Sequence, residues 1–362
     1  MKQLSFLLVL FQFLTLFAQE EIKKYPFTVG TRAQYGFILN HSETMEFITR
    51  QHISAFELYF EKNTLGEKDW ESEYNLPKWG MAFYAAHLNQ YLGNGYGIHP
   101  YISIPIIKKP NFNLDFRMGA GIGYISNPFD ETENFKNVAI GSNINSFLTL
   151  MMDSYVSLTD RMNLHANISF THFSNAAFSK PNLGINIPTL GLGLAYDLGE
   201  VQVIDPIEKA EFNRKVNPIK LSIRAGFGIS ETSAVLDKKY VSGILSIAAE
   251  KQVTAKSKLG LESNVFQSGA LVKELEALGD TMSSDIGAMQ IGIGASHTLT
   301  FDRLGLYLQL GVYLKSKYKE EGNSYRRLGL IYTFENKLST HIILKTHAFK
   351  AEYVEFGIGY TL

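Results

Sequence analysis

Residues 162–171, MNLHANISFT, alternate apolar and polar side chains without a break. Residues 188–196, PTLGLGLAY, repeat the pattern, with apolar side chains at every second position and Thr, Gly or Ala between them. Successive side chains of a β-strand point to opposite faces, so a period of two predicts strands with one apolar face. Both stretches are therefore predicted to be strands of a sheet that is apolar on one side.

The alternation extends over nearly the whole chain, interrupted by turns rich in Gly, Asn, Asp and Pro. Residues 271–278, LVKELEAL, are predicted to form one or two helical turns in a loop. The pattern predicts eight strands on each side of a polar linker at residues 200–217. The predicted strands are 27–39, 54–61, 79–92, 97–107, 112–125, 142–158, 161–174 and 187–198, then 218–230, 240–253, 257–267, 285–300, 303–316, 323–334, 338–348 and 351–362.

Two environments suit the apolar faces of these strands, namely a second sheet in a soluble sandwich or the lipid of a membrane. The many alternating strands, the few continuous apolar runs and the 13% aromatic content favour an all-β fold, an antiparallel transmembrane β-barrel. Closure of a barrel leaves no unpaired edge in the hydrocarbon. Two versions stay open, either two tandem eight-stranded barrels joined by residues 200–217 or one barrel of about sixteen strands.

The N-terminus predicts secretion. Lys2 precedes an apolar run over residues 4–17, so residues 1–18 are predicted to be a signal peptide and residues 19–199 the first barrel domain. A transmembrane helix is the alternative, but the run is short for that and no stop-transfer charges follow it. The chain has no Cys, which excludes disulfides and thiolate chemistry, and its net charge of −1 gives no case for nucleic acid.

The second half, residues 218–362, reads as a diverged copy of the first. RAQYGFI near the start of the first half recurs as RAGFGIS in the second. A segment that ends at His172 aligns with one that ends at His347, which sets Phe349 opposite Ser174. The alternative is that any two barrel halves share alternation and turns. If the halves are duplicates, only the first carries a candidate nucleophile.

One segment carries candidate chemistry. It reads THFSNA at residues 171–176 and PNLGIN at residues 181–186. His172 and Ser174 are two apart on a strand and share a face, where an imidazole can take the hydroxyl proton as acyl transfer requires. They continue the apolar series that ends at Phe170, so they are predicted to face lipid. An ordinary pair of interfacial polar side chains is the alternative.

The strand count predicts a leaflet. With the N-terminus in the periplasm, odd strands run outward, so the seventh strand ends at the outer surface with His172 and Ser174. The outer leaflet of a Gram-negative outer membrane is lipopolysaccharide. Residues 40–53 and 174–186 suit this direction as long extracellular loops. Residues 62–78 do not, because the count leaves this long loop in the periplasm.

These residues resemble the PagL-type family of lipid A 3-O-deacylases, outer-membrane barrels with a His-x-Ser-Asn run followed by a Pro-Asn-x-Gly turn. The resemblance covers roughly residues 27–198 and implies hydrolysis of an ester-linked acyl chain of lipid A without a cofactor or a metal. It implies Ser174 as the nucleophile and His172 as the base. It also implies an oxyanion or substrate-binding group formed by Ala176, Asn182 and Asn175, whose physical basis is preorganised hydrogen-bond donors.

One position departs from the family pattern, because Asn186 stands where the family has Glu. An amide oxygen can fix the imidazole tautomer but cannot neutralise the imidazolium that forms during attack. Unrelated outer-membrane phospholipases resemble this variant in using Ser, His and Asn. Asp153 and Asp197 are predicted to point inward, so neither is expected to replace the carboxylate. We expect an active enzyme that is slower than a Glu-containing relative.

Three functions stay open. The first is a serine esterase of lipid A in the cell outer membrane, and the second is an outer-membrane phospholipase. The third is a non-catalytic barrel that acts as an adhesin, a scaffold or a narrow channel. The expected partners are lipopolysaccharide and outer-membrane lipids, and a homodimer is left open. Scattered histidines (His41, His87 and His99) lack metal spacing and are predicted to lie at the interface or in the lumen.

Overall fold

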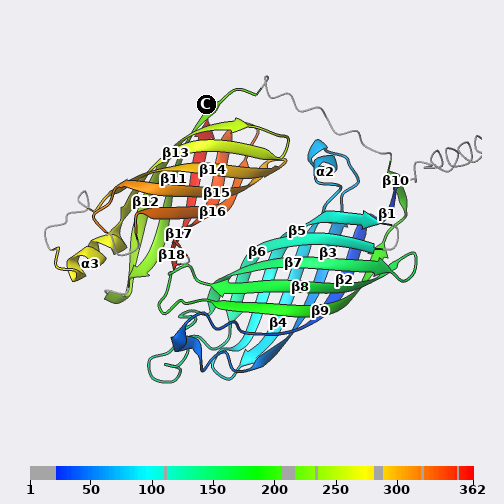
Figure 1. The fold of residues 1–362 in the computed structure, drawn as a ribbon, viewed down its shortest axis with the longest axis horizontal. Coiled ribbons are helices and arrows are strands. Elements are labelled where there is room, and N and C mark those ends of the chain that lie inside the picture. Colours follow the sequence, from blue (N-terminus) through cyan, green and yellow to red (C-terminus); the bar gives the residue numbers. More distant parts are fainter. Residues whose placement is uncertain are drawn as a thin grey trace, which may run out of the picture.

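The computed structural model describes residues 22–109, 112–204, 217–232, 235–280, 288–318, 322–348 and 350–362. It contains two closed eight-stranded antiparallel barrels (Figure 1). In each barrel every strand pairs with its neighbours in sequence, and the last strand pairs with the first. The alternative of one barrel with about sixteen strands is therefore wrong. The predicted signal peptide, most of the predicted linker and Phe349 lie outside the described residues.

All sixteen predicted barrel strands are present, with ends that differ by a few residues. The first barrel consists of β2 (Phe27–Phe37), β3 (His52–Asn63), β4 (Lys78–Asn89), β5 (Gly93–Lys109), β6 (Phe112–Ile125), β7 (Ile144–Ser157), β8 (Met162–Ser174) and β9 (Ile185–Leu198). The second consists of β11 (Lys220–Thr232), β12 (Val235–Gln252), β13 (Ser257–Ser268), β14 (Gln290–Phe301), β15 (Leu304–Lys315), β16 (Ser324–Thr333), β17 (Leu338–His347) and β18 (Lys350–Thr361). The remaining elements are β1 (Ile22–Lys24), η1 (Glu43–Met45), α2 (Asp69–Glu73), β10 (Gln202–Ile204) and α3 (Gly269–Ala277).

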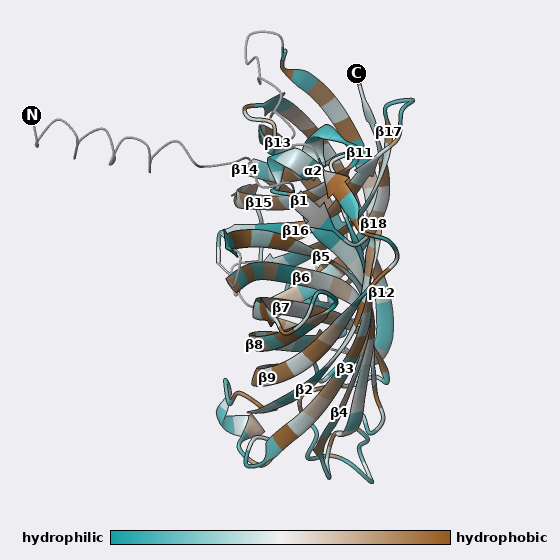
Figure 2. Ribbon diagram, turned by 90° about the vertical axis from the view of Figure 1, so that its right-hand side faces the viewer, coloured by the Kyte–Doolittle hydropathy of each residue, from teal (hydrophilic) through white to brown (hydrophobic). Residues whose placement is uncertain are grey.

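Along most of each strand the apolar side chains point outward and the polar ones inward. A cluster of buried apolar side chains, which includes Tyr84, Phe147 and Phe173, fills the interior of the first barrel near Ser174. In β8 the inward positions are buried, while Leu164, Ile168 and Phe170 are exposed on the outside. Hydrophobic and hydrophilic residues therefore alternate along the strands (Figure 2). Exposed aromatic residues gather near both ends of the first barrel, as expected of interfacial girdles. They are Phe27, Phe60, Trp79, Phe112 and Tyr196 at one end and Tyr35, Phe37, Tyr96 and Tyr124 at the other.

Charged networks fill the interior of both barrels. In the first barrel Arg32 pairs with Glu57 at 2.7 Å and with Asp153 at 2.6 Å. In the second barrel Arg327 pairs with Glu262 and Glu355, each at 2.7 Å. These side chains are fully or almost fully buried, and buried charges are tolerated when they are paired and hydrogen-bonded. An eight-stranded barrel is just wide enough for side chains to fill it, and paired charges together with buried aromatic rings fill both interiors.

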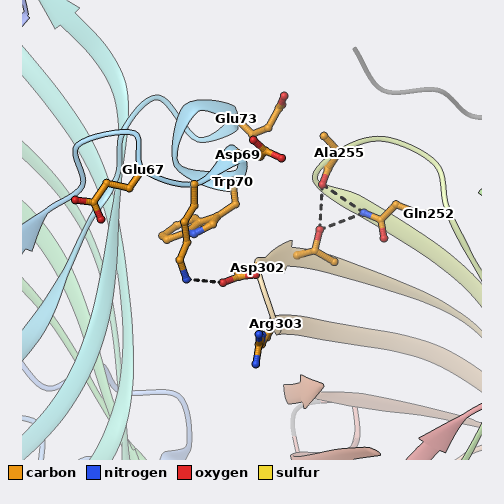
Figure 3. Close-up of a pocket in the computed structure, with 10 residues that line it drawn as sticks. Glu67, Asp69, Trp70, Glu73, Gln252, Ala255, Asp302 and Arg303 are labelled. Carbon is orange, nitrogen blue, oxygen red and sulfur yellow. Dashed lines mark hydrogen bonds and ion pairs between the residues drawn. The ribbon is translucent and has the colours of Figure 1, made fainter. Parts of the chain in front are cut away.

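One contact between the barrels lies at the end opposite the His172 and Ser174 segment. The loop that carries α2 reaches from the first barrel to the turn between β14 and β15. There the ring of Tyr74 stacks on Phe301 at 4.4 Å, and Lys68 pairs with Asp302 at 2.8 Å. A cavity of about 760 Å³ lies at this contact, and Trp70 of α2 and Asp302 of the β14–β15 turn are among the residues that line it (Figure 3). The long loop that did not fit the strand count is thus an inter-barrel contact.

Among the described residues, no helix is long and apolar enough to cross a membrane.

Candidate functional site

The β8–β9 hairpin brings the first two site residues together. His172 on β8 is directly opposite Asn186 on β9 in the strand register. Directly opposed residues of an antiparallel pair present their side chains on the same face at contact distance. The imidazole Nδ1 of His172 accordingly donates to Oδ1 of Asn186 at 2.6 Å. This hydrogen bond leaves Nε2 unprotonated, which is the state that a general base requires.

Gly184 packs against the imidazole of His172. Its φ of +80° lies in the left-handed region, which favours glycine. A Cβ at this position would lie 2.8 Å from Cε1 of His172. The glycine of the motif therefore serves both the turn and the close approach of the loop to the base.

Two hydrogen-bond donors surround the hydroxyl of Ser174. The backbone N–H of Ala176 donates to Oγ at 3.2 Å, and Nδ2 of Asn182 donates to it at 3.1 Å. Ala176 has a φ of +52° and Ala177 a φ of +64°. This left-handed pair turns the chain back, so that the Ala176 N–H points at the Ser174 side chain. Both groups predicted to bind an oxyanion thus lie beside the candidate nucleophile.

Asn175 contributes through its backbone. Its N–H donates to Oδ1 of Asn182 at 3.1 Å. The same oxygen accepts from Ser174 Oγ at 3.3 Å, so both ends of the Asn182 amide lie against Ser174. Its side chain is buried and donates to Ser142 Oγ and to the Ser179 carbonyl, both at 2.9 Å. The Asn175 side chain therefore fixes the loop and turns away from Ser174.

His41 is a site residue that sequence reasoning missed. Its Nδ1 lies 3.3 Å from Nδ2 of Asn186, and its Nε2 lies 3.1 Å from the carbonyl of Leu183. Nδ1 of His41 also lies 3.2 Å from the carbonyl of Leu39. His41 thus contacts the amide nitrogen of Asn186, while His172 contacts its oxygen. No spacing in the sequence indicates this contact, because His41 comes from the distant loop after β2.

The nearby carboxylates point into the lumen, as predicted. Asp153 pairs with Arg32 and lies 2.9 Å from His165. Asp197 accepts from Thr28 at 2.6 Å and from Asn163 at 2.9 Å. Both carboxylates are committed to interior partners. Within the described ranges, no group of His, Cys, Asp and Glu is arranged to hold a metal.

The second barrel has no matching base at the aligned position. His347 is buried on the inside of β17, where Nε2 lies 2.7 Å from the hydroxyl of Tyr313. His172, by contrast, lies on the outside of β8. The aligned histidines are therefore out of phase by one strand position, because a slip of one residue moves a side chain to the other face. The duplication of the two halves stays a prediction.

The arrangement has the parts needed for acyl transfer on the outer surface of a barrel. His172 and Ser174 share the outer face of β8 and are half-buried among exposed apolar side chains. A histidine held through Nδ1, a hydroxyl on the same strand face and two donors at that hydroxyl are groups that serine hydrolases use. The site opens onto the surface that the exposed Leu148, Phe170 and Leu190 make apolar.

Several solved structures of membrane barrels are similar to this chain, at low identity. Neisserial surface protein A (NspA) is 10% identical with a TM-score of 0.31, over 49% of this chain and 100% of that one. The KdgM porin in complex with disordered oligogalacturonate is 7% identical with a TM-score of 0.20, over 74% and 93%. A mutant Rh. blastica porin is 8% identical with a TM-score of 0.17, over 94% and 100%. TM-scores this low carry no argument, so the fold assignment rests on the strand pairing.

Two family models together match most of the chain. Residues 54–195 match lipid A 3-O-deacylase (PagL), and this range includes His172, Ser174 and Asn186. Residues 219–362 match the C-terminal domain of acyloxyacyl hydrolase (PagL_C), which spans the second barrel. No curated protein matches the chain. The chain therefore belongs to the PagL family of lipid A deacylases, hydrolases of lipid A acyl esters in the outer membrane.

Proposed function

We propose that this protein hydrolyses the ester-linked acyl chain at the 3 position of lipid A, with Ser174 as the nucleophile and His172 as the base. The observation that carries the proposal is the pair of donors at Ser174 Oγ beside a histidine whose Nδ1 is already bonded to Asn186. The outward position of these groups gives direct access to a substrate whose acyl chains lie in the membrane.

The proposed reaction passes through an acyl-serine intermediate. Nε2 of His172 takes the proton of Ser174 as Oγ attacks the ester carbonyl. The Ala176 N–H and Asn182 Nδ2 turn from Oγ to the oxyanion that forms next to it. Collapse of this intermediate breaks the ester bond, and His172 gives its proton to the departing sugar hydroxyl. Water then attacks the acyl-serine with His172 again as the base, which releases the fatty acid and restores Ser174.

Asn186 fixes the tautomer of His172 but supplies no negative charge. The imidazolium that forms during attack is therefore stabilised less than it would be beside a carboxylate. His41 lies 3.3 Å from the amide nitrogen of Asn186, so polar contacts run from His172 through Asn186 to His41. This uncharged arrangement fits a slow esterase.

The outer leaflet is the proposed location of the substrate. Ser174 lies at the end of the first barrel that carries the loops 38–51, 126–143 and 175–184. The longer loops of bacterial outer-membrane barrels are extracellular. Lipopolysaccharide in that leaflet would present its sugar at the height of the loops and its acyl chains along the outer faces of β8 and β9.

A purified enzyme assay tests the proposal. Wild-type protein in mixed micelles should release one hydroxy fatty acid from lipid A, and Ser174→Ala should release none. Ser154→Ala is the matched control, since Ser154 donates to the Ala166 carbonyl on the outside of β7 and should leave activity unchanged. Equal release by wild type and Ser174→Ala would overturn the proposal. Cleavage of phospholipid in preference to lipid A would instead support the phospholipase that Asn186 also suits.

A further inference from the structure

The loop between β8 and β9 contacts the second barrel at its outer end. The backbone N–H of Glu231, at the end of β11, donates to the carbonyl of Ala177 at 2.8 Å. The carboxylate of Glu231 in turn accepts from the backbone N–H of Lys180 at 3.1 Å. One residue of the second barrel thus binds the loop at two points, one of them directly beside Ala176.

Glu231 is itself held firmly in the second barrel. It is buried, and its carboxylate pairs with Lys239 of β12 at 2.7 Å. The ammonium of Lys239 lies 5.0 Å from the ring centre of Phe178, which belongs to the same loop. The next residue, Thr232, donates through its hydroxyl to Glu274 of α3. The loop is therefore bound to an ordered corner formed by β11, β12 and α3.

The backbone conformation of this loop is one that the surrounding structure must stabilise. Ala176 and Ala177 both have positive φ values, and neither is a glycine. Non-glycine residues keep this conformation only where the surrounding structure enforces it. The N–H of Ala176 is one of the two donors at Ser174, so any relaxation of the pair would move that donor away from the reacting oxygen.

We propose that the second barrel positions the oxyanion-binding loop of the first, and that Glu231 is the positioning residue, through its bonds to Ala177 and Lys180. The inference rests on the proposed function of Ser174. It assigns the second barrel a part in the reaction of the first barrel, although its own aligned histidine points into the lumen.

Kinetics of Glu231 variants test the inference. Glu231→Ala removes the acceptor for Lys180 and the partner of Lys239, so kcat on lipid A micelles should fall about tenfold to a hundredfold, while KM changes less than about twofold. Glu231→Gln keeps an acceptor oxygen, so its kcat should lie between those of the wild type and of Glu231→Ala. The matched control is Glu276→Ala, which removes the 2.7 Å pair with Lys273 on α3 of the same barrel. Wild-type kcat in Glu231→Ala, or an equal loss in Glu276→Ala, would overturn the inference.

Two further experiments distinguish a failure of this inference from a failure of the proposed function. Ser174→Ala is assayed alongside. If Ser174→Ala is inactive while Glu231→Ala is fully active, only the inference fails, whereas activity in Ser174→Ala refutes the proposed function. The contact is tested without activity by replacing Phe178 and Lys239 with Cys in this cysteine-free chain. A short bismaleimide should link the two in the folded protein, and failure to link them would contradict the contact.

Discussion

The amide of Asn186 is the residue that sets this site apart from the family pattern that it resembles. Asn186→Glu should place a carboxylate within hydrogen-bond reach of His172 Nδ1, which the Asn186 amide oxygen contacts at 2.6 Å. The carboxylate would stabilise the imidazolium, and kcat should rise about tenfold or more. Steady-state kinetics on lipid A micelles check this, with Asn186→Ala as the variant that should lose activity. An Asn186→Glu enzyme with unchanged or abolished activity would refute the assigned role of this residue.

Gly184 gives a second prediction at the residue scale. Gly184→Ala should cost about 1 kcal/mol or more in stability, because φ is +80°, and should also displace His172 and abolish most activity. Gly279→Ala is a matched control, since Gly279 has a φ of +92° and nothing within 4 Å of its added Cβ. It should lose similar stability and keep activity. Equal activity of the two variants would show that the imidazole does not depend on Gly184.

The hairpin of β8 and β9 shows how far the sequence alone reaches. The alternation of apolar and polar residues predicted every barrel strand and placed His172 and Ser174 on the apolar face. This was possible because the face on which a strand residue lies depends only on its position along the strand. The direct pairing of His172 with Asn186 depends on the register of the hairpin, which the loop sets. The contact of His41 with Asn186 depends on the packing of two loops that are distant in sequence, and no periodicity encodes that.

The outer face of β9 provides a test of its contact with lipid. Leu190 is 65% exposed, so in a water-soluble sandwich an Arg there would cost little. In a membrane barrel Leu190→Arg should lose about 2–4 kcal/mol of folding free energy. Urea unfolding in lipid vesicles measures this loss. Leu183→Arg, in the loop before β9, is the control and should be close to neutral. A neutral Leu190→Arg would contradict a lipid-facing β9.

At the scale of the whole molecule, both lumens contain buried ion pairs rather than an open path. Arg32 with Glu57 and Arg327 with Glu262 lie within their barrels and are almost fully buried. Wild-type protein in planar bilayers should therefore show no stepwise ion conductance, whereas a porin-sized barrel would conduct. Stable conductance steps in the wild type, absent from empty bilayers, would contradict the filled interiors.

How the two barrels pack against each other could not be predicted from the sequence. A polar linker indicates two units but not how they pack. Their contacts come from single residues in loops and strand ends, such as Tyr74 with Phe301 at one end and Ala177 with Glu231 at the other. The long loop of residues 62–78 indicated this contact indirectly. The strand count placed a long loop in the periplasm, where short turns are expected, but it did not predict a partner for the loop.

The central claim is that Ser174 removes an acyl chain from lipid A. Mass spectrometry of lipid A from cells that express the wild type or Ser174→Ala tests it most directly, with both proteins confirmed in the outer membrane. The account predicts that the wild type removes one hydroxyacyl mass and that the loss disappears in Ser174→Ala. Lipid A of identical mass in the two strains would contradict it.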